Sequence, residues 1–147
     1  MANMVPYAFP VELLSKTHDF TSDTFKLALY TANPYTQSTS TVYVATSESS
    51  GTEYSAGGNT LAGNAVSNVA DIATVDFTDS VWGSPTPATF SAAYGTIYNS
   101  SASNKLVVVL DFGGTKSCSN GTFTVTFPSP TSGSPSGADA LLSIKSN

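Results

Sequence analysis

The most apolar run of the chain is LVVVL at residues 106–110, in which every position is hydrophobic. Successive side chains of a strand point to opposite faces, so a run without alternation predicts a strand that is covered on both faces. A buried helix segment is the rival interpretation. Three consecutive valines favour extended backbone, and turn residues close the run at strand length. We therefore expect residues 106–110 to form the central strand of the fold.

Alternating apolar and polar residues predict further strands, each with one face toward the core. The alternation is clearest in FKLALY at residues 25–30 and in TFTVTF at residues 122–127. Asn120-Gly121 precedes the second run and favours a hairpin turn, because both central residues of a type I′ turn need positive φ. The other predicted strands are residues 41–46, 69–77, 94–98 and 138–145. The last of these segments could instead begin as a helix.

Turn-forming residues separate the predicted strands. They gather in residues 17–24, 48–63, 99–104 and 128–137. The segment 128–137 must be a loop, because its prolines cannot donate to a sheet ladder. About seven to nine strands with this spacing predict an all-β fold, a single-domain antiparallel β-sandwich or jelly roll. We expect residues 24–147 to form that domain.

Residues 1–23 precede the domain as an N-terminal arm. Within it, residues 11–16 could form a short helix with Pro10 at the first helical position and with Leu13 and Leu14 on an apolar side. Two interpretations of the arm stay open. The helix closes one end of the sandwich, or the arm reaches onto a neighbouring subunit.

Composition narrows the classes of function. Charged residues make up only 10% of the 147 residues, the net charge is −5, and arginine is absent. Arginine is the preferred residue for phosphates and base edges, so we expect no nucleic-acid binding. No apolar run has the length of a membrane span, and the N-terminus lacks the pattern of a signal peptide, so we expect no membrane partner.

The residues that could carry chemistry are few. Cys118 and His18 are each the only one of their kind and lie far apart in sequence, so we interpret Cys118 as a buried structural thiol. The sole tryptophan, Trp82, is interpreted as a core residue. The carboxylates that could cluster are Asp71, Asp76, Asp79 and Asp111. Their spacing shows neither an acid–base pair nor a metal-binding loop, so we expect no enzyme, no cofactor and no metal.

Candidate contacts with a partner protein lie in three segments. Tyr7 and Phe9 belong to the N-terminal arm, where prolines flank aromatic residues. Tyr54 is a candidate if it lies exposed near the tip of the loop at residues 48–63; the alternative is that this loop only connects two strands. Pro130 and Pro135 lie in the proline-rich loop, whose length favours contact with a partner.

Four blocks of the sequence resemble a family of small virion structural proteins of tailed bacteriophages. The blocks are FPVELLSKTHDFTSDTFKLALYT, ESSGTEYSAGGNTL, VDFTDSVW and TIYNSSASNKLVVVLDFGGTKSCSNGTFTVTFP, and they span residues 9–127. In the family an arginine often precedes the strand that here reads YGTIY at residues 94–98, whereas this chain has Ala92-Ala93-Tyr94. The resemblance implies no catalytic residues.

The resemblance implies a place in the virion, reached by assembly in the host cytoplasm. Some small phage proteins of this size are capsid cement or decoration proteins, so the expected partner is the major capsid protein at capsomer junctions. Self-association as a dimer or trimer is expected on the shell. The alternative is a tail, neck or fibre component, including a module that binds a host receptor or glycan.

Overall fold

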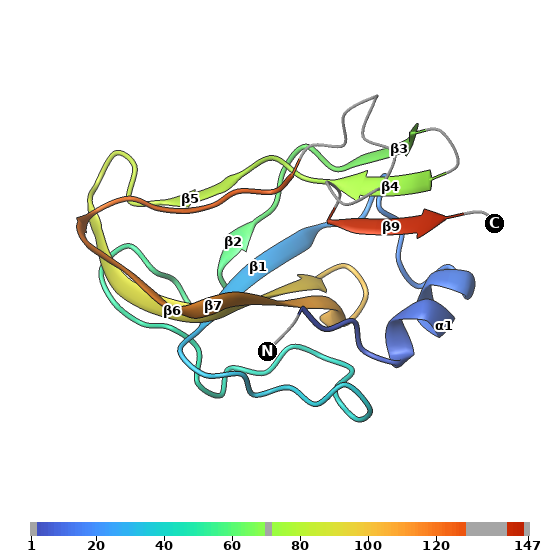
Figure 1. The fold of residues 1–147 in the computed structure, drawn as a ribbon, viewed down its shortest axis with the longest axis horizontal. Helices are drawn as coiled ribbons and strands as arrows, with labels where there is room; N and C mark the ends of the chain where they lie inside the picture. The colour runs from blue at the N-terminus through green and yellow to red at the C-terminus, as the bar shows by residue number, and fades with distance from the viewer. Residues whose placement is uncertain (1–2, 70–71, 129–140, 146–147) are drawn as a thin grey trace.

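The computed structural model of the chain describes residues 3–69, 72–128 and 141–145 and shows a strand-rich fold with one short helix (Figure 1). The helix is α1 (Ala8–Leu14), and the strands are β1 (Phe25–Tyr30), β2 (Asn59–Thr60), β3 (Ala65–Val69), β4 (Ile72–Asp76), β5 (Ser80–Trp82), β6 (Ala88–Asn99), β7 (Lys105–Gly121), β8 (Phe123–Val125) and β9 (Leu142–Lys145). Every pairing between these strands is antiparallel. The prediction of an all-β class is confirmed.

The largest sheet has the strand order β2-β1-β6-β7. Strands β6 and β7 form its long hairpin, joined by the predicted turn. The apolar run at residues 106–110 begins β7, and its first four residues are buried. Val108 belongs to the main core cluster, whereas Val109 belongs to a second cluster with Tyr30 and Tyr98. This strand is therefore covered on both faces, as its pattern predicts.

Two smaller sheets, β3-β4-β9 and β5-β8, lie on the side of the core opposite β6 and β7 (Figure 1). Their registers place them end to end. Strand β5 follows β4 in the chain. Strand β8 pairs with β5, where Val125 lies opposite Ser80, and β9 pairs with β4, where Leu142 lies opposite Val75. The pair β5-β8 therefore continues the line of the pair β4-β9. The two sheets are consecutive parts of one layer.

Aromatic side chains join this layer to the large sheet. The ring of Phe25 on β1 lies 5.6 Å from that of Phe77, and the ring of Trp82 on β5 lies 6.2 Å from that of Phe90 on β6. Trp82 is 3% exposed, which confirms its predicted place in the core. Such tilted and edge-on ring pairs add to the stabilisation from burial.

Helix α1 begins before the predicted segment and ends inside it. Pro10 lies in the first turn, where its missing N–H leaves no bond unmade. The helix cannot continue through residue 16, because Lys16 has a φ of 60°. The inward side of the helix carries Phe9, which packs with His18 and Phe20.

The predicted hairpin at Asn120-Gly121 is wrong. Asn120 does have a φ of 49°, but β7 continues to Gly121, which pairs with Ala88 of β6. The chain then crosses to the opposite layer, where β8 pairs with β5. The aromatic face of β8 is buried in that layer, where Phe123 packs against Trp82.

Two other predicted strands differ from the structure. Residues 41–46 form only an isolated bridge between Val42 and Lys105, since the backbone of Val44 bonds to tyrosine hydroxyls instead of a ladder. The segment 69–77 is divided between the end of β3 and the whole of β4, which pair as a hairpin. Its residues 70–71 lie outside the described part of the chain.

Candidate interaction surfaces

An apolar stripe runs along the outward side of α1. Tyr7, Val11 and Leu14 follow the i, i+4, i+7 spacing of one helix face. They are 64%, 66% and 87% exposed. We call these three residues the α1 stripe. Helix α1 lies at one end of the molecule, near the β6–β7 turn (Figure 1).

The opposite side of α1 is fixed in the protein. Phe9 is 3% exposed in the main core cluster, and Leu13 packs against that cluster. The carboxylate of Glu12 forms an ion pair with Lys105 Nζ at 2.7 Å. Its other oxygen lies 3.3 Å from His18 Nε2. The helix therefore presents its apolar stripe from a rigid support.

A groove of about 380 Å³ separates α1 and the turn that follows it from the sheet β3-β4-β9. Its walls include Leu13 and Phe20 on one side and Val66, Ala73 and Ile144 on the other. Val66 and Ile144 are exposed although they share the core-facing side of their sheet with Val75. This end of the gap between the layers is thus open and apolar.

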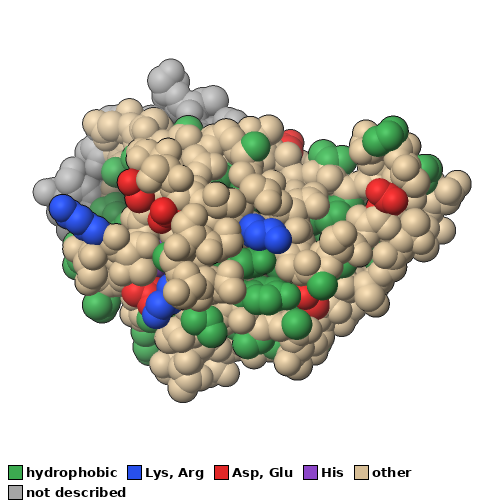
Figure 2. Space-filling view, turned by 180° about the vertical axis from the view of Figure 1, so that it is seen from behind, with side chains coloured by type: hydrophobic (Ala, Val, Ile, Leu, Met, Phe, Trp, Pro, Cys, Tyr) green, Lys and Arg blue, Asp and Glu red, His purple; other side chains and the backbone are tan. Residues whose placement is uncertain are grey.

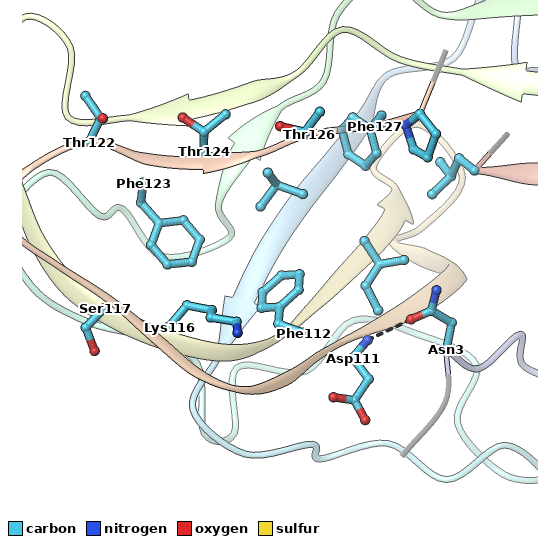
Figure 3. Close-up of a pocket in the computed structure, with 14 residues that line it drawn as sticks. Asn3, Asp111, Phe112, Lys116, Ser117, Thr122, Phe123, Thr124, Thr126 and Phe127 are labelled. Carbon is cyan, nitrogen blue, oxygen red and sulfur yellow. Dashed lines mark hydrogen bonds between the residues drawn. The ribbon is translucent and has the colours of Figure 1, made fainter. Parts of the chain in front are cut away.

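A larger cleft, of about 650 Å³, opens between β7 and β8. Figure 3 shows Phe123 pointing from β8 toward Phe112 of β7, and the two ring centroids are 6.4 Å apart. Thr122 and Thr124 lie along the strand above these rings, and Asn3 Oδ1 accepts a hydrogen bond from the N–H of Asp111 at 2.9 Å. The rings of Phe112 and Phe123 thus line the cleft, and the side chains of Thr122 and Thr124 leave the strand on its other side (Figure 3).

Tyr54 does not lie exposed at a loop tip, as its sequence context predicts. Its ring packs against Trp82 and Phe90. Its hydroxyl donates to Glu48 Oε1 at 2.8 Å and accepts from the N–H of Leu29 at 2.8 Å. Tyr54 joins the loop to the core and offers only part of its surface to a partner.

The other predicted contact residues differ in their exposure to solvent. Tyr7 is exposed in the α1 stripe, and partner contact stays a prediction for it. The side chain of Phe9 is occupied by the core, so it supports the helix and does not reach outward. Pro130 and Pro135 lie outside the described residues. Val11 and Leu14 were not among the predicted contacts, although their spacing from Tyr7 indicates that all three share one face of a helix.

The described carboxylates that were candidates for chemistry accept hydrogen bonds from backbone N–H groups. Asp76 Oδ1 accepts from the N–H of Phe77, and Asp79 Oδ1 accepts from the N–H of Phe127. Asp111 Oδ1 accepts from the N–H of Gly113. Asp71 lies outside the described residues. Within the described ranges, no three metal-ligating side chains converge.

Cys118 and His18 are also engaged where they lie. Cys118 is buried on β7, and its Sγ lies 3.6 Å from the carbonyl oxygen of Phe90. His18 is buried between Glu12 and Asn99, and burial lowers the pKa of its ring below the ordinary 6.5. The thiol and the imidazole lie in different parts of the fold and form no pair.

The surface between these features is mostly uncharged. Figure 2 shows a face on which lysines, aspartates and glutamates are few, among uncharged polar and backbone atoms and apolar side chains. Of the helices described, none is long and apolar enough to cross a bilayer.

No protein-family profile, curated protein sequence or solved structure matches this chain. The features that point to a role are therefore its own surfaces.

Proposed function

We propose that this chain is a non-enzymatic structural protein of a tailed-bacteriophage virion, a capsid cement protein that binds the major capsid protein at capsomer junctions. The place in the virion rests on the resemblance of residues 9–127 to small phage structural proteins. The α1 stripe is the observation that supports binding to another protein. Contiguous exposed apolar residues on a soluble chain mark contact surfaces more often than single ones do.

The fold that we propose for this role is a β-sandwich of jelly-roll type. The large sheet would be one layer, and the sheets β3-β4-β9 and β5-β8 together would be the other. The aromatic contacts between Phe25 and Phe77 and between Trp82 and Phe90 support this arrangement. Aligned layers that share one aromatic core are typical of sandwiches.

The α1 stripe would act by insertion into an apolar surface at the junction between capsomers. Because Phe9 and Glu12 already hold the helix in place, little conformational entropy remains to be lost on binding. Each contact adds buried area across a joint of the shell. Many identical sites, and a dimer or trimer of the protein, would make modest contacts collectively strong.

The test replaces the stripe with polar residues. In the variant Val11→Gln/Leu14→Gln, we expect co-sedimentation with purified expanded capsids to weaken at least tenfold, about 1.4 kcal/mol, because the apolar contact is lost. The melting temperature should stay near that of the wild type, since both side chains are exposed. Val81→Gln, on the exposed side of β5, is the matched control and should bind normally.

Two results would contradict the proposal. Capsid binding that is unchanged in the stripe variant would remove the stripe from the interface. Immuno-gold label confined to the tail of intact particles would exclude a cement role and favour the tail, neck or fibre alternative.

A further inference from the structure

The sole histidine of the chain stands where α1, the turn after it and the β6–β7 hairpin meet. His18 is 5% exposed. Its ring centroid lies 5.2 Å from that of Phe9 on α1 and 6.4 Å from that of Phe20 in the turn. The ring is thus enclosed by apolar groups on its faces, and only its two nitrogens reach polar partners.

The hydrogen bonds around His18 define which nitrogen carries the proton. Asn99 Oδ1 accepts from the backbone N–H groups of Ser101 and Ala102, at 3.0 and 3.1 Å. The amide of Asn99 therefore cannot be turned around, and its Nδ2 is the donor that faces His18 Nδ1 at 3.2 Å. Since Nδ1 must accept, the neutral ring carries its hydrogen on Nε2, which donates to Glu12 Oε2 at 3.3 Å.

Asn99 has no freedom to adapt to a charged ring. Its Nδ2 also donates to Asp23 Oδ2 at 2.6 Å, and the residue is fully buried on β6. A proton added to His18 Nδ1 would point at an N–H group, so two donors would face each other. Either the ring or the segment that carries it must then move.

Charged groups act on the ring from every element packed against it. Glu12 on α1 and Asp23 in the turn favour the imidazolium, whereas Lys105 on β7 opposes it. Lys16 and Asp19 line the adjacent groove. Burial of the ring outweighs the two carboxylates, so the pKa of His18 is lowered.

We propose that His18 is an acid-sensitive latch, which in its neutral form ties α1 to the β6–β7 turn and on protonation releases the helix. Release would expose Phe9 and would free the α1 stripe from its rigid support. The proposal does not depend on a role in the virion.

The direction of the pH effect follows from linkage. A histidine whose pKa is lowered in the fold stabilises the latched state above its ordinary pKa of 6.5 and ceases to do so as the pH falls through the lowered value. Between those two values, each unit of pH should raise the released-to-latched ratio by up to about tenfold. Most carboxylates titrate below this window, so the effect belongs to the histidine.

The experiment titrates the isolated protein from about pH 8 to about pH 5 and follows two signals. Nitrogen NMR of the single imidazole should show the Nε2–H tautomer at neutral pH and a pKa below 6.5. Amide hydrogen exchange of residues 8–14 should accelerate in step with the protonation of His18, while the exchange of β1 stays slow. In His18→Asn, whose amide oxygen can still accept from Asn99, this acceleration should be absent.

The wild-type measurements alone can overturn the latch, so a variant that folds poorly does not prevent a decision. An Nδ1–H tautomer at neutral pH would contradict the hydrogen-bond assignment. Helix exchange that is unchanged at a pH where His18 is charged would show that protonation does not release α1. Capsid binding plays no part in either readout, so the result is distinct from the test of the cement role.

Discussion

Phe9 and Leu14 are apolar residues of the same short helix, and their surroundings differ completely. Phe9 is 3% exposed and packs with the aromatic core, whereas Leu14 is 87% exposed. Hydrophobic character alone does not distinguish them. What distinguishes them is the direction in which each side chain leaves the helix.

This difference makes a matched pair of substitutions. We expect Phe9→Ala to lower the free energy of unfolding by about 3–5 kcal/mol, because it leaves a cavity among packed rings. Leu14→Ala should change it by no more than about 0.5 kcal/mol. Urea denaturation of both variants measures the two values, and similar losses would contradict the placement of Phe9 in the core.

Two glycines with nearly the same positive φ offer a second pair. Gly58 and Gly113 have φ values of 69° and 70°. A Cβ at Gly58 would overlap the carbonyl oxygen of Leu27 on β1, whereas a Cβ at Gly113 would meet no described atom within 4 Å. Gly58 is needed for close approach to the sheet, and Gly113 only for its backbone angle.

Replacement by alanine separates the cost of backbone strain from the cost of steric overlap with β1. Gly113→Ala should lose about 1–2 kcal/mol of stability from backbone strain alone. Gly58→Ala carries the same strain and also pushes the loop from the sheet, so we expect a loss above about 3 kcal/mol. Thermal or urea unfolding gives both numbers. An equal loss at the two sites would mean that the loop moves away from Leu27 without cost.

At the scale of elements, the segment between β1 and β2 is held by isolated backbone bridges and by side-chain hydrogen bonds. Glu48 is its centre, since its carboxylate accepts from the hydroxyls of Tyr43 and Tyr54 and from the N–H of Gly57. The hydroxyl of Tyr98 on β6 donates to the carbonyl of Gly57. This network fastens the segment to the large sheet.

The network predicts resistance of tyrosines to ionisation. Burial, and then the charge of Glu48, raises the pKa of Tyr98 to about 12 from the ordinary 10.0. Burial likewise raises the pKa values of Tyr30 and Tyr54. The neutral phenols stabilise the fold fully below pH 10, and this stabilisation is lost as the pH rises through the raised values.

An alkaline titration followed by phenolate absorbance should therefore show a delayed group of tyrosines, with loss of structure as that group ionises. In Glu48→Gln the delay should shorten, because the negative charge that opposes the phenolates is gone. Titration of all seven tyrosines near pH 10, with the fold intact, would contradict the buried network.

At the scale of the whole molecule, the chain is closed by contacts between distant segments. Asn3 and Met4 bond to β7 near its centre, and the turn after α1 bonds to the β6–β7 turn through Asn99. The N-terminal arm expected at residues 1–23 thus packs through α1 against the rest of the fold. The inward side of α1 agrees with the interpretation that the helix closes one end of the fold. The interpretation that the arm contacts a neighbouring subunit remains a proposal, which rests on the exposed α1 stripe.

Local pattern in the sequence determined the class of the fold and several of its elements. The strand at residues 25–30 has the predicted bounds, and the run at residues 106–110 is buried on both faces. The continuous run reports burial on both faces, because successive side chains of a strand point to opposite sides. The alternation in β1 predicted one buried face, whereas Ala28 and Tyr30 on its other face are buried too, in the second cluster. The positions of Trp82 and Cys118 in the interior also follow from residue type alone.

Tertiary structure decided what local pattern leaves open. Asn120 takes the positive φ of a tight turn, but only the opposite layer determines that the chain crosses over there and does not return. In the same way, only the packing of α1 separates Phe9 from the exposed stripe, and only the enclosure of His18 creates the proposed latch. The physical reason is that direction and partner depend on contacts between residues far apart in sequence, which the pattern of neighbouring residues does not contain.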